Sequence, residues 1–124
     1  MNIFAWFVLG HLLGDWLLQN DWMALGKRQG LLTRAGLAHY SVYTLSILIM
    51  LHFSNDIQLT SPTLWLVSLI IFISHWLIDA TNLVEGWMAV AGQRNQAVVR
   101  IMIDQTFHLL VLALLAQLFF ANIH

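Results

Sequence analysis

The sequence has no cysteine, a single proline and few charged residues. Without cysteine it has no disulfide, no thiolate metal site and no cysteine nucleophile. Only 9% of its 124 residues are charged, whereas an ordinary soluble domain has about 25%. Its five Lys and Arg residues are matched by six Asp and Glu residues, so no basic excess is available to bind nucleic acid. The composition therefore excludes an ordinary soluble domain and predicts no nucleic-acid partner.

Apolar residues are abundant, since they make up 60% of the chain and give a mean hydropathy of +0.76. A helix needs about 20 mostly apolar residues to cross a membrane. We predict an all-α membrane protein in which residues 1–124 form a single transmembrane domain surrounded by lipid bilayer. The short connections favour an antiparallel bundle of four transmembrane helices. The predicted spans are residues 3–23, 34–53, 63–84 and 98–121.

The positively charged residues flank the first and third predicted connections, and none lies near the second. Lys27, Arg28 and Arg34 flank the first connection, and Arg94 and Arg100 flank the third. Lys and Arg residues beside short loops stay on the cytoplasmic side of a membrane. The distribution therefore predicts a multi-pass protein of the bacterial inner membrane with both termini in the periplasm.

The two halves of the chain resemble each other. The sequence H-L-L-G-D at 11–15 is echoed by H-W-L-I-D at 75–79, and W-M-A at 22–24 recurs at 87–89. Such a repeat favours two helical hairpins in parallel orientation about an axis along the membrane normal. Short matches among so few residue types also arise by chance, so the repeat stays a hypothesis.

Seven ionisable residues fall well inside the predicted spans, where each is costly unless it faces the protein interior or a wet cavity. In three spans a His and an Asp are four positions apart, which places both on one helix face. The topology brings these faces together in the cytoplasmic half of the bilayer, so we predict one shared cluster. The candidate metal ligands are His11, Asp15, His39, His75, Asp79, Asp104 and His108.

Charge limits what this cluster can be, because its three carboxylates have no Lys or Arg deep inside any predicted span. Unpaired buried anions take up protons or bind cations. Two divalent ions with a bridging hydroxide would balance the carboxylates, and so would one ion with a shared proton. Imidazole and carboxylate without thiolate suit zinc, iron or manganese, so we predict one or two such ions. The residues expected to orient the ligands are Gln19, Tyr43, Asn82 and Gln105.

Three classes of function fit such a cluster. The first is metal-dependent hydrolysis of a lipid-like phospho- or acyl-ester at the inner leaflet, with an unligated Asp or His as general base. The second is a proton or metal-ion transporter or channel component. The mainly apolar outer halves of the spans argue against a continuous pore within one chain, although a homo-oligomer can form one between subunits. The third is a non-catalytic subunit of a membrane complex, in which the cluster only joins helices.

Three motifs resemble those of a known family: H-L-L-G-D-W-L-L-Q at 11–19, S-H-W-L-I-D at 74–79 and D-Q-T-F-H at 104–108. The chain resembles, over nearly its whole length, the bacterial family named domain of unknown function 3307. This resemblance implies a small four-span membrane protein and implies no particular activity. The H-x-x-x-D pattern is also similar to inner-membrane metal-dependent hydrolases, but the lengths disagree and no residue role transfers.

Overall fold

The computed structural model describes residues 1–93 and 96–122, and these residues form helices joined by short connections without any strand. Three helices are long and apolar enough to cross a membrane, which supports a multi-pass membrane protein. They are α3 (Arg34–Phe53), α4 (Pro62–Ala80) and α6 (Ala97–Phe120). The bounds of α3 and α6 agree with the prediction to within one residue, whereas α4 ends earlier than predicted.

The first predicted span, 3–23, is wrong as a single helix. α1 (Ile3–Leu12) continues into a π-helical turn, η1 (Leu13–Leu17), and the chain then bends before a short helix, α2 (Asp21–Gly26). At about 1.5 Å per residue, the apolar helix Ile3–Leu17 is shorter than the roughly 30 Å hydrocarbon core of a bilayer. The first segment therefore differs from the three long helices in both length and regularity.

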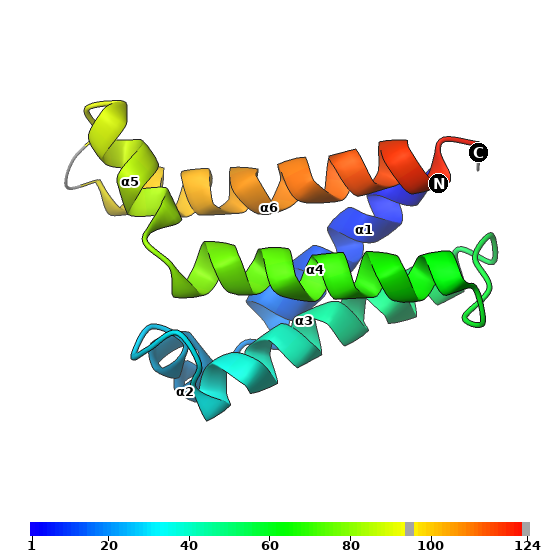
Figure 1. Ribbon diagram of the computed structural model, residues 1–124, viewed down its shortest axis with the longest axis horizontal. Helices are drawn as coiled ribbons and strands as arrows, with labels where there is room; N and C mark the ends of the chain where they lie inside the picture. Colours follow the sequence, from blue (N-terminus) through cyan, green and yellow to red (C-terminus); the bar gives the residue numbers. More distant parts are fainter. Residues whose placement is uncertain (94–95, 123–124) are drawn as a thin grey trace.

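Two short helices begin at the ends of the first and third predicted spans and continue into the predicted connections. α2 begins after Asn20, whose side chain accepts a hydrogen bond from the backbone N–H of Met23 at 2.9 Å. The other short helix, α5 (Leu83–Val90), follows shortly after the end of α4. Both lie at the same end of the bundle (Figure 1). An apolar helix, a short helix and a long helix thus follow one another twice along the chain.

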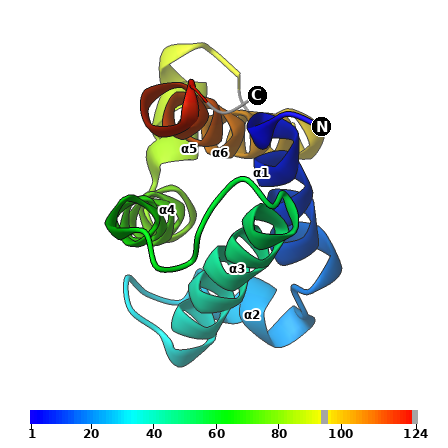
Figure 2. The same ribbon diagram turned by 90° about the vertical axis from the view of Figure 1, so that its right-hand side faces the viewer.

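Four helices surround the interior of the molecule. α1 packs against α3 and α6, and α4 packs against the same two helices. In the view along the bundle, α1 and α4 lie on opposite sides of the interior, as do α3 and α6 (Figure 2). Gly10 and Gly14 let the first segment approach α3 closely, because a Cβ atom there would lie 2.5 Å from Ile47 Cα and 2.7 Å from Tyr43 Cα respectively.

The interior is apolar toward one end of the bundle and polar toward the other. The apolar half is formed by the first turns of α1 and α4 and the last turns of α3 and α6. Its buried side chains include Ile3, Phe7, Ile47, Leu51, Leu64, Val67, Ile71, Leu112, Leu115 and Phe120. The polar half lies at the end that carries α2 and α5.

Candidate metal centre

The polar half of the interior collects ionisable side chains from all four surrounding segments. His39 and His75 are completely buried, and His11 and His108 are no more than 2% exposed. The antiparallel course of the helices explains this gathering, because the ends of η1 and α4 meet the beginnings of α3 and α6. The predicted ligands that share this half are His11, Asp15, His39, His75, Asp79, Asp104 and His108.

Four of these side chains converge on one centre. Asp15, His39, His75 and Asp79 each offer a ligand atom, and the four atoms lie within 4.8 Å of one another. His39 Nε2 lies 2.9 Å from His75 Nε2 and 3.2 Å from Asp15 Oδ1. Asp79 Oδ2 lies 3.3 Å from His39 Nε2 and 3.4 Å from His75 Nε2. We call these four residues the ligand group.

The spacing within the ligand group fits a metal ion. Zinc binds imidazole nitrogen and carboxylate oxygen at about 2.0–2.2 Å in tetrahedral geometry, which sets neighbouring ligand atoms about 3.3 Å apart. The separations that involve the two imidazole nitrogens scatter around that value, from 2.9 Å between His39 and His75 to 3.8 Å between His75 Nε2 and Asp15 Oδ1. The two nitrogens and two oxygens are therefore close enough together to bind one ion.

An unpartnered oxygen points to the same conclusion. Asp15 Oδ1 is buried and forms no well-aligned hydrogen bond among the described residues, although His39 Nε2 lies 3.2 Å from it. The other oxygen of this carboxylate, Oδ2, accepts a hydrogen bond from Gln105 Nε2 at 2.8 Å. Leaving a buried carboxylate oxygen without a donor is costly. A cation within the ligand group would remove that cost, so the donor set fits a metal ion.

His108 connects two members of the ligand group. Its Nδ1 lies 3.2 Å from His75 Nδ1, and its Nε2 lies 3.1 Å from Asp79 Oδ1. When His75 uses Nε2 as a ligand, its Nδ1–H can donate to His108 Nδ1, and His108 Nε2–H then donates to Asp79. Such contacts hold metal ligands in orientation. His108 also forms a second possible metal group with Asp15 and Asp104.

Lys27 corrects the prediction that no cation lies among the carboxylates. It was expected only beside a cytoplasmic connection, but it is 8% exposed and its Nζ lies 2.5 Å from Asp79 Oδ2. The same Nζ lies 3.4 Å from His39 Nε2. Its long aliphatic stem lets the ammonium reach inward from the end of α2. With Lys27 present, one divalent ion balances Asp15, Asp79 and Asp104 with neutral imidazoles.

His11 lies beside the ligand group rather than in it. Its Nε2 is 2.7 Å from Gln105 Oε1, and its Nδ1 is 3.0 Å from the Tyr43 hydroxyl. The ring of Tyr43 stacks on His75, with centroids 3.6 Å apart and planes 6° apart. Gln105 also binds Asp15, so it links His11 to the ligand group. The four-residue spacing of His11 and Asp15 predicted one regular α-helical turn with both side chains on the same face. The π-helical turn between them changes the rotation about the helix axis, so the two side chains point in different directions than predicted.

Two of the predicted orienting residues occupy different places. Gln19 lies beyond the end of η1, so it does not extend a helical stripe, and its Oε1 is buried without a partner among the described residues. Asn82 is exposed between α4 and α5. Neither side chain makes a hydrogen bond to a candidate ligand within the part of the chain that the structure describes. Their positions follow from the early ends of the first and third predicted spans.

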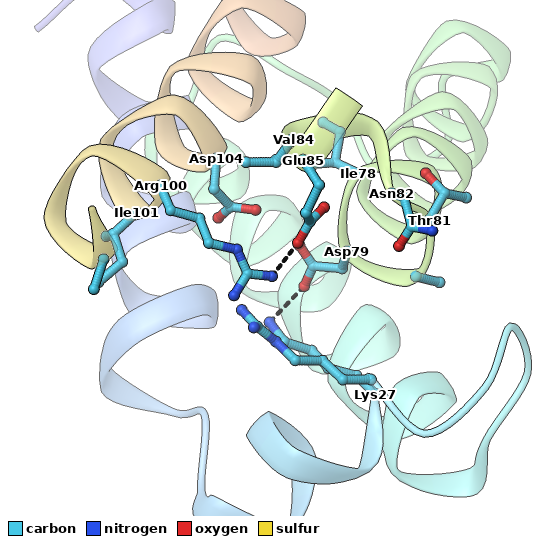
Figure 3. A pocket seen from close by; sticks show the side chains of 13 residues that line it. Lys27, Ile78, Asp79, Thr81, Asn82, Val84, Glu85, Arg100, Ile101 and Asp104 are labelled. Carbon is cyan, nitrogen blue, oxygen red and sulfur yellow. Dashed lines mark hydrogen bonds and ion pairs between the residues drawn. The ribbon is translucent and has the colours of Figure 1, made fainter. Parts of the chain in front are cut away.

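A cavity of about 430 Å³ lies next to the ligand group at the end of the bundle. The charged side chains directed toward it come from α4, α5, α6 and the segment after α2 (Figure 3). Arg100 pairs with Glu85 where the cavity meets the surface. The charged residues that line it are Lys27, Arg28, Asp79, Glu85, Arg100 and Asp104. The cavity connects Asp79 with the outside of the bundle.

From the sequence, Lys27, Arg28 and Arg100 predicted only the orientation of the chain in the membrane. None of them was expected at the site. One feature of the sequence could have indicated their role: three carboxylates inside the predicted spans lack a balancing charge, and these cations lie close to the span ends. Long Lys and Arg side chains can bridge that distance. Arg94, also used to predict orientation, and His124 lie outside the described residues.

Comparison with known proteins gives a family without a described activity. No curated protein and no solved structure matches the chain. The family model described as "Protein of unknown function (DUF3307)" matches residues 3–124, which confirms the resemblance seen in the three motifs. The chain therefore belongs to the DUF3307 family.

Proposed function

We propose that this chain is an integral membrane metal-binding protein that hydrolyses an ester of a lipid-like molecule. The observation that carries the proposal is the convergence of Asp15, His39, His75 and Asp79 on one buried centre. Two further facts support it: the buried Asp15 Oδ1 forms no well-aligned hydrogen bond within the described residues, and a cavity reaches Asp79. A purely structural cluster would require neither an unsatisfied oxygen nor access from outside.

The cations support a placement in the bacterial inner membrane with both termini in the periplasm. Lys27, Arg28, Arg34 and Arg100 all belong to segments at the end of the bundle that carries α2 and α5 (Figure 1). The positive-inside rule assigns that end to the cytoplasm. α3, α4 and α6 would cross the bilayer as complete spans, and the first segment would form a shorter fourth. The ligand group would then lie in the cytoplasmic half.

We expect one ion per chain, and zinc, iron or manganese are the candidates because the ligand set offers nitrogen and oxygen but no sulfur. Lys27 and one divalent ion together balance the three carboxylates of the polar half. A second ion held by Asp15, Asp104 and His108 would add positive charge that no further carboxylate in that half offsets. The chemistry that such an ion supplies is polarisation of the ester and activation of water.

Asp104 is the carboxylate placed to accept a proton. It lies outside the ligand group, its side chain is 26% exposed and it lines the cavity. In ester hydrolysis the oxygen of water bonds to the carbonyl carbon or to phosphorus, and the bond to the leaving alcohol breaks. Asp104 takes one proton from the water and returns it to the oxygen of the departing alcohol. Water is thus divided between the acid and alcohol products.

The apolar half argues against a transport path through a single chain. A proton or ion path needs polar groups at all depths. In this structure the interior beyond the ligand group is filled by side chains such as Phe7, Ile71 and Leu112, each no more than 1% exposed. Assembly as a homo-oligomer or within a larger membrane complex stays a prediction.

The test is the metal content of the purified protein, measured with variants that have matched controls. We expect about one zinc, iron or manganese ion in the wild-type chain and almost none in His75→Ala or Asp79→Asn. The controls are His52→Ala and Asp56→Asn, which change the same residue types at exposed positions and should keep the metal. Size-exclusion elution and helical circular dichroism would verify folding.

The two parts of the proposal give separate results. A folded wild-type chain without metal after reconstitution would overturn the metal site and the hydrolase together. Metal binding without hydrolysis of any fatty acyl or phosphate ester in detergent micelles would overturn the hydrolase and leave a metal-binding protein. Hydrolysis that disappears in Asp104→Asn while the metal remains would support the role of Asp104.

A further inference from the structure

The cavity beside the ligand group has an unusual balance of charge. Three cationic side chains, Lys27, Arg28 and Arg100, line it together with three carboxylates, so its formal charge is zero. One of those carboxylates belongs to Asp79, a member of the ligand group. A divalent ion bound there would be shared with the carboxylate of Asp15, so the ion, its ligands and the cavity together would have one excess positive charge. A ligand with one negative charge would restore neutrality.

The cations are arranged so that some of them are available to a ligand. Lys27 is held by Asp79 at the inner side of the cavity, and Arg100 is paired with Glu85 at the outer side (Figure 3). The pair of Arg100 and Glu85 is half exposed, with side chains 39% and 44% accessible, so it is a weak attachment. Arg28 is exposed, lines the same cavity and has no ion pair among the described residues.

The donors and the size of the cavity favour a phosphate group over an uncharged acyl ester. The planar guanidinium of arginine binds phosphate oxygens through two parallel hydrogen bonds, and lysine adds a point charge. An acyl ester has no charge that would need these partners. The volume of about 430 Å³ exceeds the space needed for a phosphate group alone and falls within the usual range for small-molecule sites.

We infer that the cavity binds the phosphate group of the substrate through Arg28, Arg100 and Lys27, next to the ion held by the ligand group. The inference rests on the proposed function and names its substrate class as a phosphoester. The phosphate can belong to a lipid headgroup or to a small soluble molecule. Both sources share the chemistry that the cavity recognises, and the experiment separates them.

Binding to the metal-loaded protein in detergent micelles tests this inference. The probes are inorganic phosphate and phosphatidic acid, and the phosphatidic acid is added to the micelles. Calorimetry measures the binding of inorganic phosphate. We expect Arg28→Gln and Arg100→Gln to weaken binding about tenfold or more, because each removes a charged donor. Glu85→Gln should strengthen binding, because it releases Arg100. Arg34→Gln is the control, since Arg34 is an exposed cation at the same end that does not line the cavity.

Metal content measured on the same samples separates the possible failures. Normal metal content with equal phosphate binding in Arg28→Gln, Arg100→Gln and Arg34→Gln would overturn this inference alone. Metal-loaded wild-type protein that binds neither probe would also overturn this inference alone. A wild-type chain without metal would overturn the proposed function and this inference with it. Binding of phosphatidic acid alone would support a lipid source, and binding of both probes would support recognition of the phosphate itself.

Discussion

The two halves of the bundle interior are built from the same helices but from opposite kinds of side chain. In one half Phe7, Ile47 and Leu64 pack with no more than 1% exposure. In the other half His39 and His75 are equally well buried, yet each is surrounded by carboxylates and imidazoles. Apolar side chains in both halves would have satisfied packing alone. The difference therefore separates an apolar half that only packs the helices together from a polar half whose His and Asp side chains could hold a metal ion.

The contrast extends to unsatisfied groups. Buried serine and threonine hydroxyls along the helices, such as those of Ser46 and Ser68, donate to carbonyl oxygens of their own helix. In the polar half, Asp15 Oδ1 and His39 Nδ1 are buried without a partner among the described residues. Unpaired buried groups are rare in folded proteins, and functional sites are a common reason for them. These two unpartnered atoms belong to residues of the ligand group, which could hold a metal ion.

The largest expected effect comes from removing one ligand while leaving the apolar half intact. His39→Ala should lower metal affinity by more than a hundredfold, because it deletes one of four ligand atoms. Ile47→Ala, on the same helix but in the apolar half, should lower thermal stability and leave the metal affinity unchanged. Titration of both variants with zinc against a chromophoric chelator measures the two affinities. Equal loss in both variants would contradict the division into two halves.

A smaller effect is expected from breaking the ion pair between Lys27 and Asp79 in the metal-free protein. Lys27→Met leaves the carboxylate buried without its cation and should destabilise the fold by about 3 kcal/mol, the lower end for a broken buried pair. The double variant with Asp79→Leu should recover much of that loss. Unfolding of the chain in mixed micelles by increasing sodium dodecyl sulfate measures both. A double variant less stable than Lys27→Met would show that this ion pair is not the source of the effect.

The smallest effects concern the packing of the first segment on α3. Gly10→Ala should destabilise the fold by about 1–3 kcal/mol, because the added Cβ would lie 2.5 Å from Ile47 Cα. Gly86→Ala in α5 is the matched control, since a Cβ there meets nothing within 4 Å. It should be neutral or stabilise the chain by up to about 1 kcal/mol through helix propensity. The same unfolding assay applies, and equal stability of the two variants would contradict close packing at Gly10.

The sequence predicted helices well where apolar composition alone determines them. α3 and α6 begin and end within one residue of the prediction, because polar residues flank a long apolar segment on both sides. The prediction of the first span failed because it continued through the polar residues 19–21 to the apolar Trp22 and Met23, whereas Asn20 caps a new helix there. Hydropathy measures partition into lipid, and it carries no information about a π-helical turn or a helix cap.

The candidate site was predictable in composition but not in detail. The four-residue spacing placed His75 with Asp79, and their ligand atoms lie 3.4 Å apart. Which histidines form one group depends on how the helices pack, and spacing within a helix does not determine that. His11 and His108 therefore fall outside the ligand group although their motifs look equivalent to the others. The role of Lys27 was not predicted because its backbone lies outside the predicted spans, whereas its ammonium group lies beside Asp79 inside the bundle.

X-ray absorption spectroscopy of the metal-loaded wild-type protein tests the metal centre most directly. The structure predicts a single first shell of nitrogen and oxygen at about 2.0–2.2 Å, with outer-shell scattering from two imidazole rings contributed by His39 and His75. The imidazole signal should be halved in His75→Ala if that variant is forced to bind metal at high concentration. A shell made of water oxygens alone, without imidazole scattering, would contradict a metal centre in the polar half.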